Sequence, residues 1–141
     1  MTTPRVVFDT NVLISVAIFP GGAPSKCLQK AEVKKAESVT CREILNEFRE
    51  KLIVKFDYTP EHAEEVIEKI IIFSEIVPIT GELKVIAADP KDDMVIECAV
   101  AGKANYIVTG DRKHMLSLGR YGEIQIVSPS DFLALKDFSE E

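Results

Sequence analysis

The chain has 141 residues, of which 46% are hydrophobic and 28% charged, a composition that fits one globular domain and excludes a disordered or low-complexity protein. Its 23 acidic residues outnumber its 17 Lys and Arg residues, and the formal net charge of -6 excludes a protein that coats nucleic acid by electrostatics alone. Three widely spaced cysteines indicate neither a disulfide framework nor a zinc–thiolate site.

Apolar runs alternate with helical patterns through the first half of the chain. Residues 5–8 have the pattern of a short buried strand, and residues 12–18 predict a helix or turn that Pro20 ends. The elements expected next are a helix over 24–35, a weak strand at 38–39 and a helix over 40–52. Thr40 and Glu43 have the spacing of a capping box at the start of that last helix.

The second half continues the alternation. The pattern predicts, in order, a helix over 59–74, a strand over 76–79, a helix over 89–101, strands over 106–109 and 123–127, and a short helix after Ser128. We therefore expect an α/β fold, a three-layer α/β/α sandwich with a mainly parallel central sheet, in a single domain over residues 1–136. Residues 137–141 form an acidic tail that we expect to be frayed.

Acidic side chains follow two of the predicted strands at the point where each strand ends. Asp9 comes directly after the first strand, and Asp111 follows the strand over 106–109. Either residue alone is also typical of a turn. Because the carboxyl ends of parallel strands meet at one edge of a sheet, where ligands usually bind, the pair indicates a functional site at that edge.

Two adjacent acids, Asp92 and Asp93, lie in the first turn of the helix predicted from residue 89. With Asp89 as the N-cap, Asp92 occupies the capping-box position and so has a structural role, whereas Asp93 has none beyond the helix dipole. Asp93 also precedes Glu97 by four residues, and a bound cation would relieve the repulsion between these like charges. We therefore expect Asp93 to be the better ligand.

Glu47 is the remaining acid on the helix over 40–52, because Glu43 belongs to the predicted capping box and Glu50 can pair with neighbouring basic residues. A plain surface position is the alternative for Glu47. Four carboxylates at one edge would be neutralised by two divalent cations, and their oxygen ligands suit Mg²⁺ or Mn²⁺. Two such cations can activate water for phosphodiester hydrolysis.

Four segments resemble those of the PIN domain family, specifically the small stand-alone VapC-like toxins of toxin–antitoxin pairs. They are V-V-F-D-T-N-V-L at residues 6–13, the segment 40–52 that contains Glu47, D-P-K-D-D at 89–93 and V-T-G-D at 108–111. The resemblance implies a metal-dependent endoribonuclease whose catalytic and metal-binding acids are Asp9, Glu47, Asp93 and Asp111. A single sequence leaves open whether Asp92 substitutes for Asp93 or assists it.

The same resemblance implies further properties. Thr10, Asn11 and Thr109 would orient the first and last acids, Mg²⁺ or Mn²⁺ would be the cofactor, and RNA the substrate. A protein antitoxin and a homodimer are the expected assemblies. No export signal and no membrane-spanning run is visible in the sequence, so we expect a cytoplasmic protein with no membrane partner.

Two other functions fit these residues less well than a nuclease does. A non-catalytic PIN-like module that binds RNA or acts as a scaffold is the alternative, although such a module usually loses acids that this chain keeps. A phosphatase of the haloacid-dehalogenase type needs a second Asp where this chain has Asn11. Candidates for phosphate contacts are basic side chains, namely Lys26, Lys30, Lys34, Lys35, Arg112, Lys113, His114 and Arg120.

Overall fold

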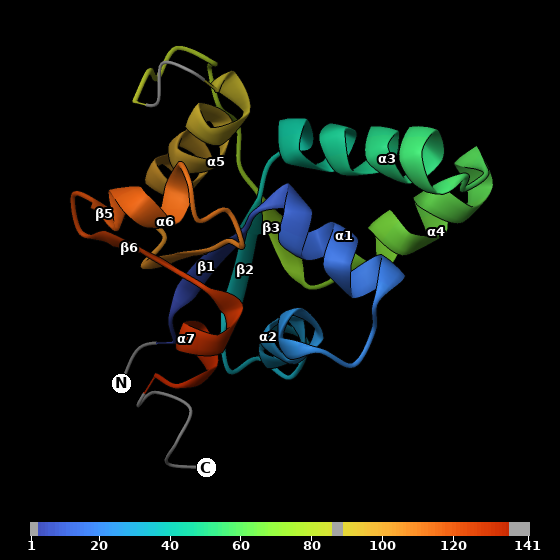
Figure 1. Cartoon of the computed structure of the whole chain (residues 1–141), viewed down its shortest axis with the longest axis horizontal. Coiled ribbons are helices and arrows are strands. Elements are labelled where there is room, and N and C mark those ends of the chain that lie inside the picture. The colour runs from blue at the N-terminus through green and yellow to red at the C-terminus, as the bar shows by residue number, and fades with distance from the viewer. Residues whose placement is uncertain (1–2, 86–88, 136–141) are drawn as a thin grey trace.

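The computed structural model describes residues 3–85 and 89–135. Within these ranges six strands form one sheet in the order β3-β2-β1-β4-β6-β5 (Figure 1). The strands are β1 (Arg5–Phe8), β2 (Glu37–Thr40), β3 (Ser74–Ile76), β4 (Tyr106–Val108), β5 (Arg120–Tyr121) and β6 (Ile124–Val127). All neighbouring pairs are parallel except β5 with β6. The sheet is therefore mainly parallel, as the sequence predicts.

Helices cover both faces of this sheet. They are α1 (Thr10–Ile18), α2 (Ala23–Glu32), α3 (Arg42–Phe56), α4 (Pro60–Ile71), α5 (Pro90–Ala101), α6 (Met115–Leu118) and α7 (Pro129–Leu133). Helices α1 to α4 connect β1, β2 and β3 in one direction, whereas α5 leads back to β4 on the other side of β1. Because such crossovers are right-handed, α5 lies on the face opposite α1 and α3 (Figure 1), which confirms the three-layer sandwich.

The central strand β1 marks the point where the strand order reverses. It pairs with β2 on one side and with β4 on the other, with Phe8 opposite Val108. The apolar residues at the carboxyl ends of β1 and β4 are deeply buried, and so are the apolar residues on the inner faces of α3 and α5. The carboxyl ends of β1 and β4 therefore open at a topological switch point, where ligands bind in sheets of this kind.

The helix α5 packs very closely on the sheet at its carboxyl end. Gly102 ends the helix, and a Cβ atom at this position would overlap the buried side chain of Val39 on β2. The Gly102 carbonyl also accepts a hydrogen bond of 2.8 Å from Nε of Arg5. A glycine at this position thus allows the carboxyl end of α5 to pack closely on β2.

The predicted strand over 76–79 was placed too late. The helix α4 ends at Ile71, and β3 begins at Ser74, whose Oγ lies 2.7 Å from Oγ of Ser38 in the neighbouring strand. Ser74 also pairs with Ser38 in the sheet register. The strand begins with polar residues, which an apolar pattern does not detect. The pattern therefore predicts the strand over the apolar residues that follow.

The predicted capping box of Thr40 and Glu43 does not form. Thr40 is the last residue of β2, where it pairs with Ile76, and the N-cap of α3 is Cys41, which makes no side-chain cap bond. Sheet pairing therefore extends one residue further than the cap pattern allows. The short elements α6 and β5 were also not predicted, because four and two residues are too few to show a periodicity.

None of the described helices is long and apolar enough to cross a membrane. The acidic residues 137–141 lie outside the described residues, and the single-domain boundary at residue 136 stays a prediction.

Candidate metal centre

Asp9 lies at the carboxyl end of β1 and is 5% exposed. Its backbone N–H donates to the carbonyl of Val108 on the neighbouring strand (3.0 Å), and its Oδ2 accepts a 2.7 Å hydrogen bond from Thr109 Oγ1. Burial raises the pKa of Asp9 above its ordinary value, and the hydrogen bonds from Thr109 and from the Thr10 N–H oppose that rise. A charged Asp9 is therefore costly unless a cation compensates it.

Asp111 follows β4 and is held by backbone donors. Its Oδ1 accepts hydrogen bonds from the N–H groups of Lys113 (3.1 Å) and His114 (3.2 Å), and its own N–H donates to Thr109 Oγ1 (3.1 Å). Its Oδ2 lies 3.6 Å from Nδ1 of His114. Asp111 thus forms the turn after β4 and also presents a carboxylate at the edge of the sheet. The turn role and the position at the site, which the sequence offers as alternatives, occur together.

Asp92 lines the same edge, in contrast to its predicted capping role. Asp89 is the N-cap of α5, and its side chain accepts from the Lys91 N–H, as expected. Asp92, however, is 6% exposed, and its buried Oδ2 has no hydrogen-bond partner. Burial and the charges of Asp89, Asp9 and Asp111 raise the pKa of Asp92 to about 7. An unpartnered carboxylate oxygen in such surroundings marks a place for a cation.

Asp93 faces a different part of the chain. Its Oδ1 accepts a 2.7 Å hydrogen bond from the backbone N–H of Val85, and it does not line the pocket that contains Asp9 and Asp92. The structure thus brings Asp92, and not Asp93, to the pocket that Asp9 and Asp111 line. The ligand role expected for Asp93 stays a prediction, as does the choice between the two acids that the sequence leaves open.

Glu97 needs no cation to relieve a repulsion with Asp93. Its carboxylate accepts hydrogen bonds from the backbone N–H (2.7 Å) and hydroxyl (2.9 Å) of Thr80 and from the N–H of Gly81 (3.2 Å). Desolvation raises its pKa, but these hydrogen bonds outweigh desolvation and hold the pKa below its ordinary value. Asp93 and Glu97 therefore bind the backbone of the segment over residues 80–85.

Glu47 reaches the site from α3 and meets two lysines. Its Oε2 lies 3.2 Å from Nζ of Lys91 and 4.0 Å from Nζ of Lys51, and Lys51 also donates to Oδ1 of Asn11 (3.2 Å). The side chain of Glu47 is 13% exposed, whereas that of Lys91 is 66% exposed. Lys91 thus reaches over the acids from solvent and can leave them at little cost.

These residues enclose a small polar pocket of about 80 Å³. It is lined by Asp9, Thr10, Asn11, Glu47, Lys51, Asp89, Lys91, Asp92 and Asp111. A pocket for an organic ligand of drug size measures about 300–1,000 Å³, so this one fits ions and water. Five carboxyl groups face two ammonium groups, and their hard oxygen ligands suit a divalent cation such as Mg²⁺ or Mn²⁺.

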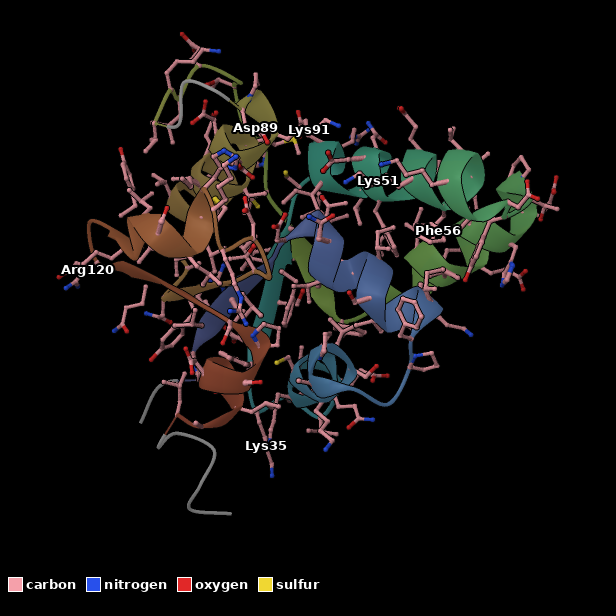
Figure 2. The ribbon with its side chains drawn as sticks, viewed as in Figure 1. Lys35, Lys51, Phe56, Asp89, Lys91 and Arg120 are labelled. Carbon is pink, nitrogen blue, oxygen red and sulfur yellow. The ribbon has the colours of Figure 1, made fainter. Side chains whose placement is uncertain are left out.

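Three lining residues are not among the site residues that the sequence predicts. The sequence indicates a helix cap for Asp89 and a charge pair with Glu50 for Lys51, and it gives no signal for Lys91. The spacing of four residues between Glu47 and Lys51 was the available signal for one of them. Figure 2 shows Lys51, Asp89 and Lys91 on the same side of the molecule, at α3 and α5.

The lysines of the α2 region lie elsewhere. Lys26, Lys30 and Lys35 line a separate hollow with Val33 and Leu133. Figure 2 shows Lys35 at the opposite end of the molecule from Asp89. Among the basic residues predicted to contact phosphate, His114 has its side chain beside the acids, near Asp111, Asp89 and Asp92.

Comparisons with known proteins agree with this fold. A family model described as "PIN domain" matches residues 5–113. A solved structure of similar fold is the crystal structure of VapBC2 from Rickettsia felis bound to a DNA fragment from their promoter, with a TM-score of 0.64 and 15% sequence identity. The match covers 88% of this chain and 98% of that chain. A comparison with curated proteins found no match.

Proposed function

Because the chain belongs to the PIN domain family, we propose that it is a divalent-metal-dependent endoribonuclease that hydrolyses RNA phosphodiester bonds. The observation that carries the proposal is the pocket at the switch point, where a buried, unpartnered oxygen of Asp92 lies among the carboxylates of Asp9, Glu47 and Asp111. Four carboxylates that repel one another at neutral pH are stable together when a cation binds between them.

Asp9, Glu47, Asp92 and Asp111 would hold Mg²⁺ or Mn²⁺, which when bound supplies an activated water and charge stabilisation for in-line displacement at phosphorus. Of the sequence candidates, we thus propose Asp92 rather than Asp93 as the third acid. Thr109 orients Asp9 through its hydroxyl, and the N–H groups after Asp111 fix that carboxylate. These bonds hold the acids in place before substrate arrives.

The two lysines have different roles in this proposal. Lys51 is largely covered and bridges Glu47 and Asn11, so it positions the α3 side of the pocket. Lys91 is exposed and lies over the acids, where it balances their charge in the absence of metal. With a cation held by the acids, the exposed Lys91 ammonium would no longer be needed for charge balance and could contact the phosphate backbone of the substrate.

A toxin kept inactive by a protein antitoxin is the biological role that we propose. The fold shared with a chain of the VapBC2 structure supports it, as do exposed apolar side chains on this chain. Phe19 and Val54 are 72% and 74% exposed, and Phe56 at the end of α3 is 38% exposed (Figure 2). Side chains of this kind are candidates for contact with an antitoxin or with a second copy in a homodimer. Light scattering on the purified chain, before and after an antitoxin candidate is added, tests both assemblies.

RNA cleavage tests the enzymatic part of the proposal. We expect purified protein to cut a labelled structured RNA with Mn²⁺ or Mg²⁺ and to stop with EDTA. The Asp9→Asn variant, purified in parallel, controls for a contaminating nuclease and should not cut. Cleavage that persists in EDTA or in folded Asp9→Asn protein would contradict the proposal. Absence of cleavage, together with no rise in melting temperature on adding metal, would instead favour a non-catalytic RNA-binding module.

A further inference from the structure

A histidine lies beside the acidic pocket and has no part in the proposed hydrolysis. His114 precedes α6, with Nδ1 placed 3.6 Å from Oδ2 of Asp111. One ligand atom each from Asp89, Asp92 and His114 lies within 4.8 Å of the other two. The side chain of His114 is 37% exposed, so water and ions can reach this group from solvent.

Two of the three residues, Asp89 and Asp92, have a carboxylate oxygen that accepts no hydrogen bond among the described residues. Asp92 is 6% exposed, and its buried Oδ2 lacks a hydrogen-bond partner. Asp89 accepts the Lys91 N–H through Oδ1, which leaves Oδ2 for another ligand. A carboxylate oxygen that is buried without a partner is costly, and a bound cation removes that cost.

We propose that Asp89, Asp92 and His114 form a second cation position that prefers a first-row transition ion such as Mn²⁺ to Mg²⁺. An imidazole nitrogen among the ligands favours first-row transition ions over Mg²⁺, which prefers oxygen ligands, and Mn²⁺ is the ion of that row that also suits the two carboxylates. Asp92 belongs both to this group and to the pocket that Asp9 lines, so it would be a ligand at both positions. The inference rests on the proposed function for its part in catalysis, but binding itself can be measured without RNA.

The test uses Mn²⁺ alone, added to the full chain after EDTA treatment and dialysis. Electron spin echo envelope modulation of bound Mn²⁺ detects a coordinated imidazole nitrogen directly. The chain has two histidines, and His62 stacks on Tyr58 by α4, which makes it a matched control. We expect ¹⁴N modulation in the parent and in His62→Gln, its loss in His114→Gln, and Mn²⁺ affinity at this position at least about tenfold weaker in that variant. A large excess of Mg²⁺ should leave the ¹⁴N modulation in place.

Two more variants keep the inference distinct from the proposed function. Asp89→Asn retains a good helix cap and removes one charged ligand, so it should weaken the modulation even if His114→Gln fails to fold. Asp9→Asn should abolish RNA cleavage and leave the modulation intact. Cleavage by the parent without any ¹⁴N modulation would overturn the inference alone, as would modulation that Mg²⁺ or Asp9→Asn removes. Modulation that depends on His114, in a protein that cuts no RNA, would support the inference and contradict the proposed function.

Discussion

The Thr109 hydroxyl donates a 2.7 Å hydrogen bond to Oδ2 of Asp9 and accepts another, of 3.1 Å, from the backbone N–H of Asp111. One fully buried side chain thus connects the acids that follow the two central strands. The parallel register of β1 and β4 brings these residues side by side. The spacing of the two carboxylates is therefore set by the sheet and by Thr109 before any ligand binds.

Removing this hydroxyl should weaken both the fold and the site. Thr109→Val leaves Asp9 without its side-chain donor, so the free energy of unfolding should fall by about 1–3 kcal/mol. The pKa of Asp9 should rise further, because the bond from Thr109 opposes the effect of burial. Mn²⁺ affinity at neutral pH should fall in consequence. Urea denaturation in EDTA and calorimetric Mn²⁺ titration measure the two effects.

Thr109→Ser, which keeps the hydroxyl, is the control. Equal losses of stability and Mn²⁺ affinity in both variants would show that the hydrogen bond from Thr109 to Asp9 does not matter.

The metal-free protein should become less stable as the pH rises toward 7. Asp92 has a pKa of about 7 in the folded chain against an ordinary value of 3.8, so between these values the folded chain binds more protons than the unfolded chain. Its neighbours are Asp89, Asp9 and Asp111, which raise the pKa, and His114, which lowers it. Urea denaturation in EDTA should give a lower free energy of unfolding at about pH 8 than at about pH 5.

The variant Asp92→Asn tests whether Asp92 causes the pH dependence of the free energy of unfolding. It should flatten much of the pH dependence and raise the metal-free melting temperature at the alkaline end, because a buried charge is removed. Mn²⁺ should reverse the loss of stability in the parent and do less for the variant. An unchanged slope in Asp92→Asn would mean that other groups carry the titration.

Asp93, unlike Asp92, should contribute to the stability of the fold and not to the binding of metal. Asp93→Asn weakens the hydrogen bond to the Val85 N–H, so it should lower the free energy of unfolding by about 1–2 kcal/mol. Its Mn²⁺ affinity should stay close to that of the parent, since Asp93 does not line the pocket. Thermal melts in EDTA and calorimetric titration with Mn²⁺ check both statements. A large loss of Mn²⁺ affinity in folded Asp93→Asn would restore the ligand role that the sequence suggested.

Lys91 should act as a competitor of the metal. Its ammonium lies 3.2 Å from Glu47 but is mostly exposed, so Lys91→Gln should change stability by no more than about 0.5 kcal/mol. Mn²⁺ should bind the variant several times more tightly at low salt, with the difference shrinking as salt is added. Lys69→Gln, on the exposed side of α4, removes the same charge far from the site and should not alter binding. Weaker Mn²⁺ binding by Lys91→Gln would indicate that Lys91 orders the acids instead.

The sequence predicts the fold and much of the site because the relevant signals are local. Apolar runs that end in Asp9 and in Thr109-Gly110-Asp111 identify two strands and the edge where they end. Sequence spacing cannot decide which of Asp92 and Asp93 lines the pocket, because Asp93 and Glu97 bind the backbone of Val85 and Thr80, and no spacing rule describes those contacts. The approach of His114 to Asp89 and Asp92 likewise depends on how α5 and the turn after β4 pack together.

The deciding measurement is the rate of RNA cleavage by Asp92→Asn and Asp93→Asn, each shown to be folded, across a titration of Mn²⁺. If Asp92 holds the cation among Asp9, Glu47 and Asp111, Asp92→Asn should cut at least about tenfold more slowly than the parent at every Mn²⁺ concentration. Asp93→Asn should cut at close to the parental rate. Parental cleavage by Asp92→Asn, with activity lost in folded Asp93→Asn, would contradict this assignment of the site.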